Sequence, residues 1–474
     1  MELYGLRSKN IFIILSIFLL CLLIPIFVIY DKMIILLGFS LFLFFDFLLK
    51  NLFEFKAYLR ILLYLLIFFI ILEFILQQNN FSTIQKISQV AEIIILLSIL
   101  TFAILKSKNW YTKEFKTLTY ILVSLIICNF VSTMFQYQNI HIFIISTLDY
   151  CKYFTLIYFI TLIKIDDKDI LKLLKVFSIV IVILSILSIL QFLGIQQFFD
   201  IFKGRFEIIE RNGFYRSIGF FPYPIELGNY CAVIFCLYYF LNKYKYKETW
   251  LYFISILLVI NIVLSGTRTS LLALIIVFIL SNLKSARQII SAAIIIVISF
   301  LIINNFMDIQ QIIDNTKVEY TGMTPRQYYT LKSIEVWKNN PIAGIGFGTY
   351  GAMKYRLQTN DVIFNKYNIH DFDFANLKTT DIFYAQILPE FGIIGVLLLF
   401  ALGKFFYSRY KILKEYDKSN CAYIYVFLTM CILALNSSSI FFSPHIGTFF
   451  WFSMGMILKN YLLLYTKNES LNVK

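Results

Sequence analysis

The segment from Thr249 to Leu283 reads TWLYFISILLVINIVLSGTRTSLLALIIVFILSNL, two apolar runs joined by a short polar turn. Each run is close to the roughly 17–25 residues that a helix needs to cross a bilayer. Backbone polar groups in lipid must be satisfied within their own segment, so runs of this kind are helical. The segment therefore predicts two membrane helices, at 249–265 and 268–283, with a polar turn between them.

The same pattern fills most of the 474-residue chain, which is 59% hydrophobic and 18% aromatic. This composition excludes an ordinary soluble domain, and a scan for apolar runs predicts an all-α polytopic membrane protein with about fourteen transmembrane helices. The other expected spans are 11–30, 33–49, 58–76, 88–105, 117–134, 142–163, 174–194, 222–241, 288–305, 381–402, 420–438 and 445–463. We expect one integral domain over residues 1–474.

The formal net charge is +14, and the basic residues fall in every second loop, for example within 164–175, 243–247 and 404–418. Cytoplasmic loops of membrane proteins carry this excess of Lys and Arg. Both termini are therefore predicted to be cytoplasmic. Because the charge is divided among separate loops rather than gathered on one face, a nucleic-acid partner is not expected. The loops predicted to face outward are 77–87, 135–141, 195–221, 304–380 and 439–444.

The outward loop at 304–380, between the eleventh and twelfth spans, is long and polar and is expected to carry the function. Thr324 and Pro325 are typical of the start of a helix. The following residues should place Tyr329, Ile334 and Trp337 near one helix face. Glycines then recur at positions 344, 346 and 348, but no Lys-Ser/Thr follows as in a phosphate loop. We interpret this run as a tight turn that packs the loop helix on the membrane domain.

Three arginines lie at outward ends of predicted spans or in the large loop: Arg216, Arg268 and Arg326. A guanidinium group binds phosphate oxygens with two parallel hydrogen bonds, which makes these arginines candidates for holding a diphosphate. The hydroxyls of Thr267 and Thr269 flank Arg268 and would supply further contacts to a substrate. The alternative is that each arginine only anchors the end of a span at the lipid headgroups.

Taken together, these stretches resemble the O-antigen ligase and polymerase superfamily of bacterial polysaccharide assembly over roughly residues 210–400. The resemblance rests on four pieces in chain order: Arg216 with Gly219 and Pro222; Ser265 to Ser270; Arg326 to Trp337 with Pro341, Gly344 and Gly346; and Asp381 to Gly395. It implies the architecture of a C-type glycosyltransferase, with the active site on the extracytoplasmic face.

One departure from the superfamily pattern bears on the chemistry. Ligases of this superfamily characteristically have His-Asn where this chain has Asp381-Ile382, while Tyr384 and Glu390 keep their places. The resemblance therefore implies a carboxylate, Asp381, as the group that accepts a proton, with His370 as the second candidate. The substitution favours a polymerase over a ligase.

The resemblance implies an inverting, metal-independent polymerase of undecaprenyl-diphosphate-linked oligosaccharide units in a bacterial cytoplasmic membrane, making capsule, exopolysaccharide or O-antigen. Donor, acceptor and membrane lipid are the expected partners, together with a chain-length regulator and a flippase, and no cofactor is expected. The assigned roles are diphosphate binding by Arg268, Arg326 and Arg216, proton transfer by Asp381 or His370, and substrate contacts by Thr267, Thr269, Tyr329 and Tyr384. Asp371 and Asp373 are the only outward residues spaced like a metal-binding pair.

Three other functions fit parts of the sequence. A ligase would use the same donor and arginines and differ only in its acceptor. A lipid-linked oligosaccharide flippase would need charged groups near mid-membrane and often two related halves, but the charges within these spans are few and isolated. A membrane scaffold would leave the arginines without a ligand.

Overall fold

The computed structural model describes residues between Thr112 and Asn472, with gaps. The described residues are 112–163, 165–195, 210–211, 214–219, 221, 223–282, 325–350, 366–367, 369, 382–437, 440–441 and 443–472. The predicted spans before residue 112 and at 288–305 therefore lie outside the described residues.

The described chain is almost entirely helical, with one two-stranded ladder in which Glu210 pairs with Tyr215 and Arg211 with Phe214. The elements are α5 (Lys113–Tyr137), α6 (Ile140–Cys151), α7 (Phe154–Leu162), α8 (Asp167–Phe192), β1 (Glu210–Arg211), β2 (Phe214–Tyr215), α10 (Pro224–Leu241), the π-helix η1 (Asn242–Tyr246), α11 (Thr249–Ser265), α12 (Arg268–Asn282), α15 (Pro325–Asn339), α18 (Phe383–Tyr416), the 3-10 helix η3 (Lys418–Asn420), α19 (Cys421–Leu433) and α20 (Pro444–Asn472).

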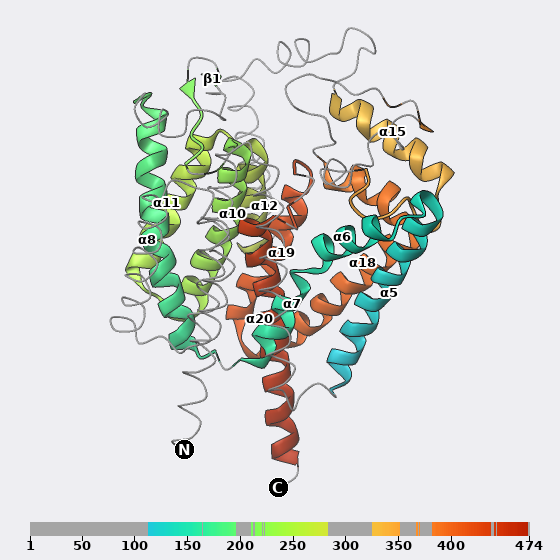
Figure 1. The fold of residues 1–474 in the computed structure, drawn as a ribbon. Coiled ribbons are helices and arrows are strands. Elements are labelled where there is room, and N and C mark those ends of the chain that lie inside the picture. Colours follow the sequence, from blue (N-terminus) through green and yellow to red (C-terminus); the bar gives the residue numbers. More distant parts are fainter. Residues whose placement is uncertain are drawn as a thin grey trace, which may run out of the picture.

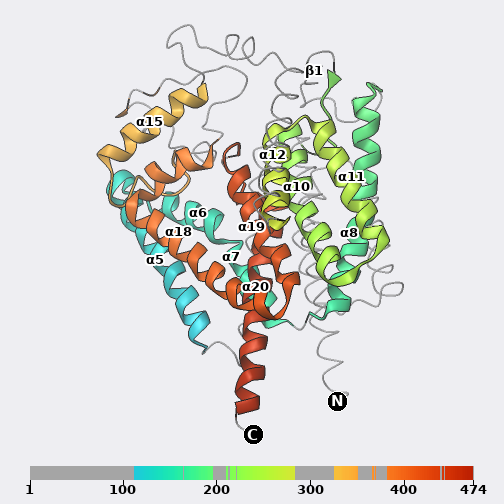
Figure 2. The ribbon, with the colours of Figure 1, turned by 180° about the vertical axis from the view of Figure 1, so that it is seen from behind.

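The helices form two groups joined by a central layer (Figures 1 and 2). In one group α8, α11, α10 and α12 pack side by side, and in the other α6, α5, α18 and α15 do so. Between them, α20 contacts α7, α10, α18 and α19. Buried aliphatic and aromatic side chains form one continuous core through both groups and the central layer.

Four described helical segments are long and apolar enough to cross a membrane: α5, α8, α10 continued by η1, and α18. The shorter helices α11, α12 and η3 with α19 are also apolar. These segments coincide with the spans predicted at 117–134, 174–194, 222–241, 249–265, 268–283, 381–402 and 420–438. The chain is thus a helical membrane protein, and the number of spans stays a prediction.

The predicted span at 142–163 is not one helix, so this prediction was wrong. The run is divided into α6 and α7 at Lys152 and Tyr153. The Thr155 hydroxyl donates to the Lys152 carbonyl at 2.6 Å, which satisfies an acceptor freed by the break. The far end of α7 is held by Lys459 of α20, whose ammonium donates to the carbonyls of Ile163 and Ile165 at 2.8 and 3.2 Å. A cation is favourable at that helix end.

The span predicted at 381–402 is longer than expected and is interrupted. Helix α18 runs to Tyr416, but Gly392 within it has φ 58° and ψ −171°. The preceding Pro389 lacks an N–H, and the carbonyls of Pro389 and Glu390 accept hydrogen bonds from the chain at Ile345 and Gly346. The apolar composition predicted the helix, but the break is made by contacts with a segment about forty residues earlier.

The basic loops and the arginine-bearing turns lie at opposite ends of the helices (Figure 1). Three loops predicted to share the cytoplasmic side do meet: Lys245 of η1 lies 2.6 Å from the Asp167 carboxylate and 3.9 Å from that of Asp417. The turns that carry Arg216 and Arg268 lie at the other end, as does α15. These basic loops therefore lie at one end of the described helices, and the side of the membrane that this end faces stays a prediction.

Candidate functional site

The site is built around the turn between α11 and α12, which we call the arginine corner (Ser265 to Arg268). Gly266 ends α11 with φ 60°, and its N–H bonds to the Val263 carbonyl at 2.9 Å. Glycine adopts this left-handed conformation without steric cost. The Thr267 carbonyl accepts from the Leu271 N–H at 3.2 Å, so α12 begins at once with Arg268 in its first turn. One glycine thus reverses the chain and leaves Arg268 at a helix N-terminus.

Small hydroxyl side chains hold the arginine corner against α10. The Ser265 hydroxyl donates to the Thr267 hydroxyl at 3.0 Å, which in turn donates to the Pro224 carbonyl at 3.0 Å. A methyl group at Gly228 of α10 would lie 2.7 Å from the Thr267 Cβ atom, so the two helices approach closely here. The Thr267 side chain is therefore buried, and its hydroxyl is used within the protein.

Arg216 lies across the arginine corner although it is fifty residues away in sequence. Its Nε atom donates to the Ser265 carbonyl at 2.8 Å, and its side chain covers the open face of Gly266. The next residue, Ser217, bonds through its N–H to the Leu264 carbonyl at 3.0 Å. The structure therefore places the Arg216 side chain against Gly266, two residues before Arg268 in sequence, and both arginine side chains are only half-buried.

A glutamine of α8 fixes the backbone that carries Arg216. The Gln191 side chain accepts from the N–H groups of Ile218 and Gly219 at 3.0 and 2.8 Å and donates to the Gly219 carbonyl at 2.8 Å. The Ser217 hydroxyl adds a bond to the Ser188 carbonyl at 2.6 Å. This short segment is thus held by side chains rather than by secondary structure. The sequence interpretation missed Gln191, although a buried amide in an apolar helix was the available signal.

The first turn of α12 is tied to two further helices. The Ser270 hydroxyl donates to the Asn229 side chain of α10 at 2.8 Å. The Thr269 hydroxyl, a candidate substrate contact, accepts from the Asn436 side chain at 2.9 Å. Arg268 therefore projects from a turn whose neighbours are fixed on both sides, and a preorganised cation of this kind is what an anionic ligand requires.

Glu226 and His445, which the sequence interpretation did not single out, lie beside the Arg216 segment. The two side chains approach to 3.5 Å between Oε2 of Glu226 in the first turn of α10 and Nε2 of His445 in the first turn of α20. The imidazole ring also packs on Phe221, with ring centres 4.9 Å apart. The pair joins α10 to α20, and the ring contact joins α20 to Phe221 in the segment before α10. Neither residue had a recognisable motif around it.

The third predicted arginine, Arg326, is in the first turn of α15, and its side chain lies outside the described residues. Helix α15 packs on α18, and its C-terminal end reaches α5, where the Gln136 amide donates to the Asn340 side chain at 2.5 Å. Its first turn lies on the side of α12 in both views (Figures 1 and 2). The helix thus crosses the end of one helical group and points toward the other.

The face of α15 that packs inward differs from the prediction. Tyr329, Ser333 and Val336 are buried, whereas Ile334 is 36% exposed. Ile334 follows Tyr329 by five residues, which is about 140° around a helix, so the two cannot share a face. Tyr350, Tyr367 and Ile369 complete the small core against which α15 packs. Tyr329, a candidate substrate contact, is therefore part of this core.

The glycine run forms what we call the glycine turn (Pro341 to Tyr350), which docks on the break in α18. The N–H groups of Ile345 and Gly346 donate to the Pro389 and Glu390 carbonyls, and those of Ile393 and Ile394 donate back to Pro341 and Ile342. Asn129 of α5 accepts from the Phe347 N–H at 2.8 Å. This arrangement confirms that the run is a packing turn and not a phosphate loop.

A buried carboxylate holds the glycine turn in place. Glu390 accepts from the N–H groups of Gly348 and Tyr350 at 2.7 and 2.9 Å and from the Tyr150 hydroxyl at 2.6 Å. Burial is the largest of several causes that raise the pKa of Tyr350. Its hydroxyl donates to the Tyr329 carbonyl at 2.6 Å. The superfamily pattern contained Glu390 as a residue in register. Its function as the centre of this network came only from the structure.

Asp381 and His370, the predicted proton acceptors, lie outside the described residues, as do Asp371 and Asp373. Tyr384 is in the first turn of α18, and its hydroxyl donates to the Cys431 carbonyl at 2.5 Å while its side chain stays partly exposed. In the described ranges, no three His, Cys, Asp or Glu side chains come together as a metal-binding group.

The fold and this site define an integral membrane protein with arginine-bearing turns gathered at one end of its helices. Residues 253–400 match the family model described as O-antigen ligase. This match confirms the resemblance to the O-antigen ligase and polymerase superfamily that the motifs indicated, over residues 253–400 of the chain. No curated protein sequence matches the chain.

Proposed function

We propose that this protein polymerises oligosaccharide repeat units carried on undecaprenyl diphosphate at the outer face of a bacterial cytoplasmic membrane. The observation that carries the proposal is the contact of Arg216 with the arginine corner, at the edge of the region that matches O-antigen ligases. Two arginines distant in sequence are fixed beside one helix N-terminus, and such a site favours phosphate groups.

The donor in this reaction leaves as a lipid diphosphate, and its negative charge grows as the bond from the anomeric carbon to the phosphate oxygen breaks. Arg268 and Arg326 would hold the diphosphate, with the first N–H groups of α12 adding partial positive charge. Arg216 would contact the same group or close the site, because its Nε atom already bonds to Ser265. Fixed cations can stabilise this leaving group without a metal ion.

The acceptor sugar hydroxyl would attack the anomeric carbon on the face opposite the phosphate, giving inversion in one step. Its proton would pass to the Asp381 carboxylate, with His370 as the second candidate. Asp381 directly precedes Ile382 at the start of α18.

The proposal favours a polymerase over a ligase because Asp381 stands where ligases have histidine. The match at 253–400 is common to both activities, since the donor and arginines are shared. In a ligase the acceptor would be a different lipid or a protein.

The test uses the purified full chain in proteoliposomes supplied with lipid-diphosphate-linked repeat units, with and without a chelator, and reads glycan length on a gel. A ladder of products that persists in chelator is the expected result. Transfer of label only to a separately supplied acceptor would show a ligase instead. Movement of the lipid across the bilayer without any new glycosidic bond would overturn the enzymatic function.

A further inference from the structure

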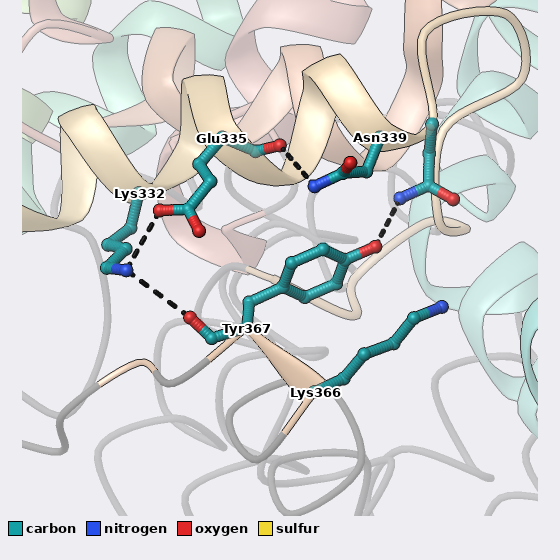
Figure 3. Close-up of a pocket in the computed structure, with 6 residues that line it drawn as sticks. Lys332, Glu335, Asn339, Lys366 and Tyr367 are labelled. Carbon is teal, nitrogen blue, oxygen red and sulfur yellow. Dashed lines mark hydrogen bonds and ion pairs between the residues drawn. The ribbon is translucent and has the colours of Figure 1, made fainter.

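A polar cavity of about 440 Å³ lies between α15 and residues 366–367 (Figure 3). Helix α15 supplies Lys332, Glu335 and Asn339 on one stripe, at the helical spacing i, i+3 and i+7. The remaining walls are Asn340, Lys366 and Tyr367. This stripe lies next to the buried stripe of Tyr329, Ser333 and Val336, so the cavity is a second, polar face of the same helix.

The walls of the cavity are held in place by their own hydrogen bonds. The Asn340 amide donates to the Tyr367 hydroxyl at 2.7 Å, and the Asn339 amide donates to the Glu335 carbonyl at 3.1 Å. The Lys332 ammonium bonds to the Glu335 carboxylate at 2.8 Å and to the Tyr367 carbonyl at 3.3 Å (Figure 3). A ligand would therefore meet polar groups that are already positioned.

Both lysines retain donor capacity toward the cavity. An ammonium group carries three N–H donors, and Lys332 uses two of them on the partners just named. Lys366 donates to the Gln136 side chain of α5 at 3.1 Å and lies 5.5 Å from the centre of the Tyr367 ring. Two cations thus border the cavity against one carboxylate, and that carboxylate is already paired with Lys332.

We propose that this cavity binds an acidic sugar residue, one that carries a carboxylate on a hydroxylated ring. Ammonium groups would bind the sugar carboxylate, while the Asn339 amide and the Glu335 carboxylate would bind ring hydroxyls. All six lining side chains end in polar atoms, so an acyl chain would gain little hydrophobic contact there. The volume lies within the roughly 300–1,000 Å³ of typical small-molecule sites.

The cavity lies on the same helix as Arg326, which would bind the diphosphate in the proposed reaction. The biological role of the cavity therefore rests on that proposed function. Lys332 follows Arg326 by six residues in α15, which is about 9 Å along the helix axis. The cavity would therefore hold a sugar of the glycan away from the reacting bond, and it would make the protein selective for an acidic repeat unit.

The test measures binding of soluble oligogalacturonides, which are acidic, and of maltooligosaccharides, which are neutral, to the full chain in lipid nanodiscs. Neither probe needs a lipid carrier or turnover, so binding is scored separately from the polymerisation assay. We expect the acidic probe to bind more tightly than the neutral probe. Lys366→Gln and Lys332→Gln should each weaken acidic binding about ten-fold.

Lys338→Gln is the matched control, because Lys338 is exposed on the same helix and does not line the cavity. It should bind like the unaltered protein. Lys366→Gln keeps the test decisive if Lys332→Gln fails to fold, because Lys366 makes one hydrogen bond at the protein surface. Equal binding of both probes, or acidic binding that survives Lys366→Gln, would overturn the proposal even if polymerisation is observed.

Discussion

The arginine corner and the glycine turn look alike in the sequence, since both combine glycine with a nearby hydroxyl residue in a turn. In the structure they differ in what their polar groups bond to. The polar groups of the glycine turn form hydrogen bonds to α5 and α18, and Glu390, the carboxylate that accepts from the turn, is fully buried. The arginine corner buries its hydroxyls but leaves Arg216 and Arg268 half-exposed.

This difference distinguishes residues that stabilise the fold from residues that can bind a ligand. A buried carboxylate that accepts three hydrogen bonds organises the chain around it and has little capacity left for a ligand. A cation at the edge of a fixed turn can still meet an anion from outside. Substitutions of Arg216 or Arg268 should therefore reduce activity at constant stability, and substitutions in the glycine turn should reduce stability first.

The largest expected effect is that of Arg268→Ala, which should reduce polymer formation by about 100-fold or more because one fixed cation at the leaving group is lost. Arg326→Ala should behave in the same way. The gel-based polymerisation assay measures the loss, and thermal unfolding in detergent should remain unchanged. Lys338→Ala is the control, and wild-type chain lengths from Arg268→Ala would remove the diphosphate function from that residue.

The next effect concerns the proton acceptor. Asp381→Asn keeps the shape of the side chain but cannot accept the proton, so it should reduce polymer formation far more than His370→Ala. Both variants are compared in the same assay at equal protein amounts. If His370→Ala is the more damaging, the base is His370. Asp371→Asn is the control, because it removes one carboxylate from the same loop at a position that is not proposed to accept the proton. It should form polymer as the unaltered protein does.

Gly392→Ala tests the glycine turn and should lower the free energy of unfolding by about 3 kcal/mol or more. Position 392 has φ 58°, and an added methyl group would lie 2.5 Å from the Gly344 nitrogen. Scanning fluorimetry in detergent measures the loss. Gly403→Ala in the same helix is the control, because its methyl group would only touch Phe427 at 3.6 Å and should not destabilise the protein.

The smallest expected effect is that of Glu390→Gln, at about 1–3 kcal/mol of stability. Three groups now donate hydrogen bonds to the carboxylate. In the glutamine variant, the N–H group of the amide would face at least one of these donors, and that hydrogen bond would be lost. Activity should fall only as far as stability does. Glu415→Gln, an exposed position on the same helix, is the control. A loss of polymer formation at unchanged stability would mean that Glu390 acts in the reaction.

The sequence predicted the membrane helices well where apolar length alone decides, as at 249–265, which coincides with α11. It also predicted that the glycine run is a packing turn, because the lysine of a phosphate loop is absent. It failed where a helix breaks within an apolar run, and at Gly392 hydrogen bonds to a distant segment accompany the break. The break at Lys152 and the interruption at Gly392 both lie within runs that composition marks as continuous helix.

What the sequence determined by itself was therefore the class of protein, the alternation of basic loops and the residue types that can bind a diphosphate. These follow from local properties: the length of apolar runs, the position of charges and the donor geometry of arginine. Only the tertiary structure decided that Arg216 reaches Gly266, that Glu390 is a buried support and that one face of α15 lines a polar cavity. Those contacts depend on which backbone N–H and carbonyl groups still lack a hydrogen-bond partner once the helices pack. The order of residues along the chain does not contain that information.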